Sequence, residues 1–316
     1  MIEVRDLTKT YGGITAIKSL NFSVKKGEVV GFLGPNGAGK STTMKIITGF
    51  MAPSSGKAMV AGYDVFENPL EVKSRIGYLP EVPPVYTDMY VTDYLRYVAQ
   101  LKGVEKSKIA KNIDNAIEKT NLGSVKKRLI GHLSKGFRQR VGIAQALVSD
   151  PAVLILDEPT VGLDPKQVSE IRDLIKELKG QHTIILSTHI LPEVQATCER
   201  IIIIHQGQIV AQDTIEHLTE RAAGAGKVFL KVRKPSELVV AALMSVPGVK
   251  QVQAMLPEQG WEINVDGSDE VIEKIANQVM QKGFGLMEIG LVKANLEDVF
   301  LQLTYNAKSN SVEHGA

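Results

Sequence analysis

A glycine-rich loop at residues 34–42 constrains the fold of this chain more than any other feature of its sequence. The loop follows a continuous apolar segment at 29–33, and its sequence is GPNGAGKST. The spacing matches G-x-x-x-x-G-K-[ST], in which glycines let backbone N–H groups curl towards an anion without side chains in the way. An apolar strand before such a loop and a helix after it predict a binding site for the phosphates of a nucleoside triphosphate.

The end of this loop supplies two side chains with distinct tasks. Lys40 would neutralise the β- and γ-phosphates, and the hydroxyl of Ser41 would hold Mg²⁺. The helix that begins near Lys40 has Met44 and Ile47 on its inward side and ends at Gly49. The predicted phosphate-binding residues are Gly34, Pro35, Asn36, Gly37, Ala38, Gly39, Lys40, Ser41 and Thr42.

Composition and length exclude several other classes of protein. A chain of 316 residues is longer than a usual single domain, so we expect a larger and a smaller one. The formal net charge is +2 without a long basic run, which gives no electrostatic case for a nucleic-acid partner. Cys198 is the only cysteine, the apolar runs are too short to cross a bilayer, and residues 1–5 contain no signal-peptide core. We therefore expect a cytosolic protein.

The order of the apolar segments predicts an α/β fold with a largely parallel sheet covered on both faces. A mostly helical block, which we interpret as an inserted helical subdomain at about 88–150, interrupts this order. The expected strands are 2–7, 16–24, 29–33, 58–61, 76–79, 153–156 and 183–186, with a hairpin from 201 to 211. The expected helices are 93–101, 109–120 and one from about 166 that Gly180 caps.

A stretch of small residues at 221–226 predicts a linker between a first domain at 1–220 and a second at 227–304. Beyond the linker the pattern is βαββαβ, which predicts a small α+β, ferredoxin-like domain. The tail at 305–316 is polar, and we expect it to be disordered. The segments of the second domain are 228–232, 236–245, 249–256, 261–265, 268–282 and 284–292, with one more helix at 296–303.

Two carboxylates follow a second buried strand, at 153–156. Asp157 would anchor Mg²⁺ through its water shell beside Ser41, and Glu158 would orient and deprotonate the attacking water. Neighbouring carboxylates repel each other and lose hydration when buried, so they need a cation close by. His189 follows another apolar strand, at 183–188, where its imidazole could hydrogen-bond a γ-phosphate. Because these strands run parallel, the sequence predicts that the three side chains share one edge of the sheet.

A possible anion site lies at Ser134 and Gly136, in the sequence LSKGFRQR that precedes a helix. Ser134 is a good N-cap residue, and Gly136 exposes a backbone N–H in the first turn. An ordinary capped helix has the same features, so this segment alone leaves both interpretations open.

Taken together, the segments 34–42, 134–140, 157–158 and 162–164 and His189 resemble the ATP-binding cassette (ABC) family in order and rough spacing. The resemblance covers about residues 1–220. It implies a P-loop ABC ATPase core with an N-terminal antiparallel β-subdomain, ATP and Mg²⁺ as ligands, and hydrolysis of ATP in which Glu158, His189 and Lys40 are catalytic.

The resemblance also assigns roles to residues outside the loop. It implies that Tyr11 stacks on adenine, that Ser134 and Gly136 form the signature motif, and that Asp164 belongs to the D-loop. Glu81 falls where the family usually has the Q-loop glutamine, and its oxygen could approach Mg²⁺. His189 corresponds to the switch histidine.

The sequence departs from the family's pattern in two places. Lys135 and Phe137 stand where the signature usually has Gly and Gln, and Glu81 is an acid. Because Ser134 and Gly136 keep the groups that meet the phosphate, we expect hydrolysis to be retained. The signature form, the acidic Q-loop and the appended domain look most like gliding-motility-type ATPase subunits of bacterial ABC-2 transporters.

The family arrangement implies partners, because Ser134 of one copy completes the phosphate site of another. We expect a second ABC ATPase subunit, a homodimer in preference to a heterodimer. We also expect integral-membrane permease subunits on separate chains, docked at 81–90, which would hold this chain at the inner face of the membrane. The alternatives are a soluble ABC-class clamp on nucleic acid or ribosomes, and a nucleotide-dependent regulator without turnover. Near-neutral charge disfavours the first, and the intact motif residues disfavour the second.

Overall fold

The computed structural model describes residues 1–223, 226–255, 260–266, 269–291, 296–297, 299–301 and 303. These residues form two compact units, and the division falls between Thr214 and Ile215. The sequence pattern places the division between domains slightly later, at 220–221, because it predicts no helix at α8 (Ile215–Ala223). In the structure this helix groups with the second unit.

A six-stranded sheet in the order β10-β9-β3-β8-β7-β6 forms the centre of the first unit. All neighbouring pairs except β9 and β10 are parallel. Every residue of β3, β7 and β8 is buried, as expected for parallel strands covered on both faces. The strands are β3 (Val29–Leu33), β6 (Ile76–Leu79), β7 (Val153–Asp157), β8 (Thr183–Thr188), β9 (Arg200–His205) and β10 (Gln208–Thr214).

A second, antiparallel sheet in the order β2-β1-β4-β5 lies at the N-terminus. Its strands are β1 (Ile2–Tyr11), β2 (Ile14–Val24), β4 (Ser55–Val60) and β5 (Tyr63–Asp64). Helix α1 (Lys40–Ile47) buries Met44, Ile46 and Ile47 in one core cluster with residues from both sheets. Burial of its apolar side therefore fixes the helix that follows the glycine-rich loop.

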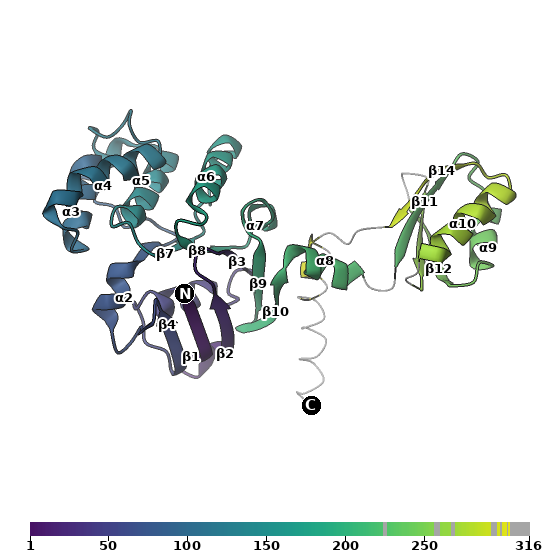
Figure 1. The fold of residues 1–316 in the computed structure, drawn as a ribbon, viewed down its shortest axis with the longest axis horizontal. Coiled ribbons are helices and arrows are strands. Elements are labelled where there is room, and N and C mark those ends of the chain that lie inside the picture. Colours follow the sequence, from purple (N-terminus) through teal and green to yellow (C-terminus); the bar gives the residue numbers. More distant parts are fainter. Residues whose placement is uncertain are drawn as a thin grey trace. The chain divides into compact units, whose positions relative to one another are not determined.

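Helices of the inserted subdomain gather on one side of the central sheet (Figure 1). They are α3 (Val91–Leu101), α4 (Lys106–Lys119), a short 3₁₀ turn at Ile130–His132 and α5 (Lys135–Leu147). Helix α5 packs closely on β6 at Gly77, where a Cβ would collide with the carbonyl of Ala146. The remaining helices of the first unit are α2 (Pro69–Arg75), which the sequence pattern does not predict, α6 (Pro165–Leu178) and α7 (Leu191–Thr197).

The second unit contains a four-stranded antiparallel sheet in the order β12-β13-β11-β14. The expected βαββαβ, ferredoxin-like fold is confirmed by this order and by two helices between the strands. The described residues from 296 to 303 are helical as well, and the tail at 305–316 lies outside the described residues. The elements are β11 (Lys227–Val232), α9 (Glu237–Met244), β12 (Val249–Met255), β13 (Gly260–Val265), α10 (Asp269–Gln281) and β14 (Leu286–Leu291).

Within the described part of the chain, no helix has the length and apolarity needed to span a membrane.

Candidate active site

Neighbouring parallel strands bring the predicted catalytic side chains to one edge of the sheet. Leu33 at the end of β3 pairs with Thr188 at the end of β8, and Asp157 at the end of β7 pairs with Ser187. The glycine-rich loop, His189 and the carboxylates of residues 157–158 all follow these strand ends. The register of the sheet therefore sets the spacing of the site.

Close backbone contacts shape the glycine-rich loop. Gly39, the residue before α1, has a φ of +106°, which glycine adopts without a side-chain penalty. A Cβ at this position would lie 2.6 Å from the Ile17 side chain and 2.8 Å from the Ala16 carbonyl oxygen. The carbonyl of Ala38 accepts a hydrogen bond of 3.0 Å from Gly207 N–H, in the hairpin turn after β9. The loop is thus held against β2 and against that turn.

Lys40 links the loop to the carboxylate of Glu158. Its ammonium donates to the carbonyl oxygens of Gly34 at 2.8 Å and Pro35 at 3.3 Å. It also lies 3.3 Å from Glu158 Oε1, and both side chains are buried. A buried carboxylate requires such a partner, since leaving it unpaired costs several kcal/mol.

Glu158 lies at the centre of the polar contacts in the site. Its carboxylate oxygens are both 3.0 Å from His189 Nδ1, and Oε2 lies 3.3 Å from the Thr188 hydroxyl. Its φ is +51°, an uncommon conformation for a residue with a Cβ that concentrates at functional sites. The backbone N–H of Glu158 donates to the Ser187 carbonyl at 2.8 Å, which holds the backbone in this strained conformation.

Asp157 is almost fully buried beside these groups. Burial raises the pKa of its carboxyl and outweighs the hydrogen bonds from Ser187 and Ser41, while the charge of Glu158 raises that pKa further and Lys40 opposes it. The Ser187 hydroxyl donates to Asp157 Oδ1 at 2.7 Å. A hydroxyl and a carboxylate side by side are hard oxygen donors, so the pair formed by Ser41 and Asp157 suits Mg²⁺.

A cleft of about 530 Å³ opens above this cluster. Glu81 contributes to its wall, so the acid that replaces the usual glutamine faces the same space as Lys40 and Glu158. Gly34, Ala38 and Asp157 are buried behind the wall. The cleft is lined by Ala16, Asn36, Gly37, Gly39, Lys40, Ser41, Thr42, Glu81, Glu158, Val161 and His189.

The predicted signature and D-loop residues lie together but outside this wall. The Ser134 hydroxyl caps α5 by accepting a hydrogen bond of 3.4 Å from Phe137 N–H, and Asp164 caps α6 by accepting one of 2.9 Å from Gln167 N–H. Gly136 lies against Gln167, where a Cβ would collide with the side-chain amide. Within one chain the first turn of α5 therefore lies against the first turn of α6, and neither Ser134, Gly136 nor Asp164 lines the cleft.

Tyr11 is also absent from the residues that line the cleft. Its ring is 42% exposed, its hydroxyl donates to Met51 Sδ at 2.8 Å, and the Lys9 ammonium lies 5.3 Å from the ring centroid. Stacking of this ring on adenine stays a prediction.

Sequence reasoning missed the residues directly behind the site, Glu193, Thr160 and Thr188. Glu193 is buried in α7 and accepts hydrogen bonds from both threonine hydroxyls. The only signal in the sequence is an acidic residue in a mostly apolar segment shortly after His189. That signal is weak, because no local pattern connects Glu193 with its hydrogen-bond partners. Thr160 lies 33 residues earlier, and Thr188 belongs to the preceding strand, β8.

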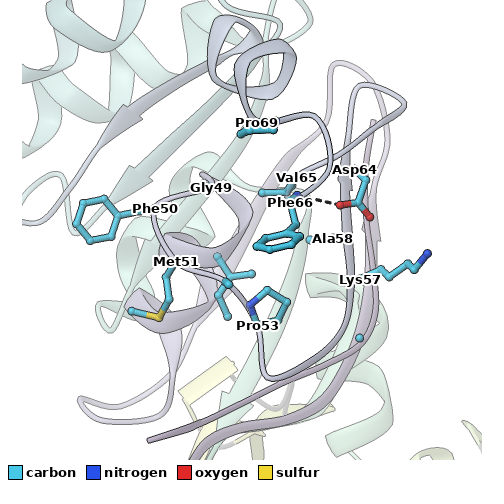
Figure 2. A pocket seen from close by; sticks show the side chains of 13 residues that line it. Gly49, Phe50, Met51, Pro53, Lys57, Ala58, Asp64, Val65, Phe66 and Pro69 are labelled. Carbon is cyan, nitrogen blue, oxygen red and sulfur yellow. Dashed lines mark hydrogen bonds between the residues drawn. The ribbon is translucent and has the colours of Figure 1, made fainter.

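A smaller hollow of about 240 Å³ lies between the end of α1 and the turn that connects β5 with α2. Figure 2 shows that its walls are mainly apolar, with Phe66 and Pro53 facing each other across it. The carboxylate of Asp64 accepts hydrogen bonds from the backbone N–H groups of Phe66 at 2.8 Å and Glu67 at 3.1 Å. The Asp64 carboxylate is thus used within the turn, and Lys57 supplies the cationic side chain of the lining.

A parallel sheet, a glycine-rich loop that leads into a helix, and buried carboxylates on the neighbouring strand define a P-loop nucleoside triphosphatase. The family model described as ABC transporter matches residues 17–161. The bacitracin transport ATP-binding protein BcrA of Bacillus licheniformis is 33% identical over 311 residues, covering 96% of this chain and 97% of that protein. This chain therefore belongs to the family of ABC transporter ATP-binding proteins, and it binds and hydrolyses ATP.

Solved structures agree with this assignment. A structure described as the ATP-binding subunit of an ABC transporter has a TM-score of 0.65 and 32% identity, covering 70% of this chain and 92% of that one. A dimeric post-hydrolysis state of an ATP-binding cassette, bound to ADP and Pi, has a TM-score of 0.63 and 25% identity, covering 68% of this chain and 98% of that one. The predicted ABC ATPase fold and activity are confirmed; membership of the gliding-motility-type subfamily stays a prediction.

Proposed function

We propose that this chain hydrolyses Mg·ATP within a closed pair of cassettes and thereby drives a membrane transporter of the ABC-2 type. The observation that carries the catalytic part is the direct contact of Glu158 with both Lys40 and His189 in one cleft. A carboxylate that touches a phosphate-binding lysine is positioned to deprotonate a water molecule aimed at the γ-phosphate.

The contacts of Lys40 suggest how ATP binding prepares the base. An ammonium group has three N–H donors, and here they are directed at the carbonyls of Gly34 and Pro35 and at Glu158. A phosphate that enters the loop competes for these N–H groups. Lys40 then turns from Glu158 towards the phosphate, which leaves the carboxylate free to accept a proton from water, while His189 holds the other side of that carboxylate.

Ser41 and Asp157, together with Glu81 in the cleft wall, would hold Mg²⁺. The ion, when bound, supplies positive charge that neutralises the phosphates and polarises the transferred phosphoryl group. Among the described residues, no group of three His, Cys, Asp or Glu side chains forms a metal cage. This suits Mg²⁺, which usually takes few protein ligands and keeps water and substrate phosphates.

A second cassette would complete the site. Ser134 and Gly136 lie at the N-terminus of α5, outside the described wall of the cleft in their own chain. The first N–H groups of a helix bind anions well, so the exposed Ser134 at this N-terminus suits the γ-phosphate held by another copy, whereas Gly136 is buried against Gln167 within its own chain. The dimeric cassette bound to ADP and Pi supports this arrangement, and we propose a homodimer.

Two substitutions test the catalytic proposal. Glu158→Gln should retain ATP binding and lower kcat by roughly 10²- to 10⁴-fold, the range for loss of a general base. Lys40→Ala should weaken ATP binding itself, as measured by titration with a fluorescent ATP analogue. In Mg·ATP, Glu158→Gln should accumulate as a dimer in light scattering, and adding Ser134→Ala should return it to the monomer. Unchanged turnover in Glu158→Gln would remove this residue from the mechanism.

Permease subunits on other chains are the proposed partners, and this chain would be held at the inner face of the membrane through them. The segment 81–90 leads into a groove of about 540 Å³ whose wall includes Pro84, Tyr94, Tyr97 and Leu101. The exposed ring of Tyr86 packs edge-on against both neighbouring tyrosines, with centroids at 6.1 and 5.8 Å. Aromatic residues of this kind commonly anchor protein interfaces.

Co-purification from membranes tests this docking surface. Tyr86→Ala should lower the amount of chain recovered with its permease by about tenfold, the effect of losing roughly 1–2 kcal/mol at an aromatic contact. Phe66→Ala removes another exposed aromatic ring, one that lines the smaller hollow and not this groove, and serves as the control. Equal recovery of the two variants would contradict the docking proposal.

A further inference from the structure

Glu193 is a buried acid to which neither the family motifs nor the proposed hydrolysis assigns a task. It lies in α7, is 1% exposed, and its two carboxylate oxygens have different partners. Oε1 accepts from the hydroxyl of Thr160, and Oε2 accepts from the hydroxyl of Thr188 at 2.9 Å. Burying an acid so completely is costly, so the structure must gain something at this position.

The partners of Glu193 belong to the two segments that carry the catalytic side chains. Thr160 lies in the loop that follows β7, two residues after Glu158, and Thr188 ends β8 directly before His189. One carboxylate thus connects the loop that carries the proposed base to the strand that carries its histidine partner. The pairing of β7 with β8 ends at Asp157 and Ser187, so the sheet does not fix the position of Thr160 in the loop beyond β7, whereas Thr188 still pairs with Leu33 of β3.

The hydroxyl of Thr188 extends the hydrogen-bonded connection from Glu193 to Glu158 itself. Its oxygen lies 2.9 Å from Glu193 Oε2 and 3.3 Å from Glu158 Oε2, and it accepts a hydrogen bond of 3.1 Å from Ile190 N–H. A hydroxyl carries a single proton, so it can donate to only one of the two carboxylates at a time. The position and charge of Glu193 therefore determine how Thr188 is oriented towards Glu158.

Helix α7 provides a rigid base for this carboxylate. Val194, the next residue, is fully buried, and it packs on β3 so closely that a Cβ on Gly31 would collide with it. The hydroxyl of Thr197 also donates to the backbone carbonyl of Glu193 at 2.7 Å. With its backbone held in this way, Glu193 can connect two separate segments by side-chain hydrogen bonds alone.

The charges around Glu193 are mixed. Burial raises the pKa of its carboxyl and is the largest influence; the hydrogen bonds from the two threonines and the positive charge of Arg172 on α6 oppose it, and Glu158 raises the pKa further. The carboxyl is thus coupled electrostatically to Glu158 as well as through Thr188.

We propose that Glu193 is a positioning residue for ATP hydrolysis, which holds Thr160 and Thr188 in register and thereby sets the orientation of Glu158 and His189. The inference rests on the proposed role of Glu158 as general base. Glu193 touches neither the phosphate loop nor the wall of the cleft among the described residues, so it affects the rate of the chemical step and not the affinity for ATP.

Kinetics of paired variants of the full chain test this role. Glu193→Ala should lower kcat by roughly 10- to 100-fold, the effect of misplacing a catalytic group by about 1 Å, and should leave affinity for a fluorescent ATP analogue within about twofold. Glu193→Gln keeps the size and one acceptor oxygen, so it should recover much of the lost kcat. Glu199→Gln is the matched control, because Glu199 lies six residues further on, is largely exposed and pairs with Lys179; its kcat should equal that of the wild type.

The same substitution, made in the Glu158→Gln variant, distinguishes a positioning role from a general loss of structure. In Glu158→Gln, adding Glu193→Ala should cause no further loss of the residual rate, because residues that act as a unit are not additive. A merely structural role would lower the rate by the same factor in both backgrounds and would weaken ATP binding in parallel, and either result overturns the inference. If Glu193→Ala does not fold, Thr160→Val carries the test, since it removes one of the two anchoring hydroxyls; wild-type kcat in that variant also overturns the inference.

The two proposals fail in different ways. Full kcat in Glu158→Gln refutes the proposed base whatever Glu193 does. A large loss in Glu158→Gln together with wild-type kcat in Glu193→Ala refutes only the positioning role.

Discussion

Replacing Gly39 by alanine tests whether the shape of the phosphate loop is set by its contacts with β2. The new Cβ would meet the Ile17 side chain at 2.6 Å and the carbonyl oxygen of Ala16 at 2.8 Å. Neither neighbour can move easily, since Ile17 is fully buried and both belong to a paired strand. The positive φ costs about 1 kcal/mol, and overpacking adds about 1–3 kcal/mol, so the free energy of unfolding should fall by about 2–4 kcal/mol.

Gly37→Ala is the matched control for this substitution. Gly37 also has a positive φ, +80°, but a Cβ there would meet nothing within 4 Å. It should therefore cost only the conformational term, about 1 kcal/mol. The difference between the two variants isolates the contact with β2.

Differential scanning calorimetry without nucleotide measures both effects. For a unit of about 200 residues, 1 kcal/mol corresponds to roughly 2–4 °C in Tm, so Gly39→Ala should melt roughly 4–16 °C lower and Gly37→Ala roughly 2–4 °C lower. Trp261 is the only tryptophan of the chain and is buried in the second unit, so its fluorescence reports that unit and should be unchanged in both variants. Equal shifts in the two variants would refute the reasoning from the β2 contact.

Two further predictions concern titrating groups. Burial raises the pKa of the Cys198 thiol to about 12, so only about one thiol in 10⁴ is ionised at pH 8 and a disulfide reagent should react slowly until the protein is unfolded; rapid reaction of the native protein would contradict this burial. Partial burial raises the pKa of Glu28, but hydrogen bonds from Arg200 and from the Lys25 N–H lower it overall. A lowered pKa stabilises the fold above the unfolded value of about 4.5 and loses that effect as the pH falls through the folded value. Glu28→Gln should therefore cost about 1 kcal/mol at pH 7, after allowing for partial exposure, and almost nothing in acid; an equal cost at both pH values in urea unfolding would contradict the assignment.

Most secondary structure of the first unit could be predicted from local patterns. The apolar strands at 29–33, 76–79 and 153–157 are continuous in the sequence because both of their faces are covered. Two short helices were not predicted from local patterns. Helix α2 is only seven residues long, and α8 gave no distinct pattern, so the division of the chain falls earlier than the linker composition predicts.

The candidate catalytic cluster was predictable for a related reason. In the sequence, each of these groups lies at the end of an apolar strand: the glycine-rich loop, the carboxylates of residues 157–158, and His189. Parallel strands bring such ends together. Glu193 could not be identified in this way. Its importance depends on hydrogen bonds to Thr160, 33 residues earlier, and to Thr188, and a helical acid in isolation predicts only a solvated side chain.

The sequence by itself identified the candidate site residues, namely a glycine-rich loop, two carboxylates and a histidine, because each belongs to a local run of residues. Tertiary structure alone decided how these groups restrain one another. Lys40 contacts Glu158, Ser134 and Asp164 do not line the cleft of their own chain, and Glu193 shares the Thr188 hydroxyl with Glu158. Such relations depend on strand register and on the packing of helices against the sheet, which join residues far apart in the chain.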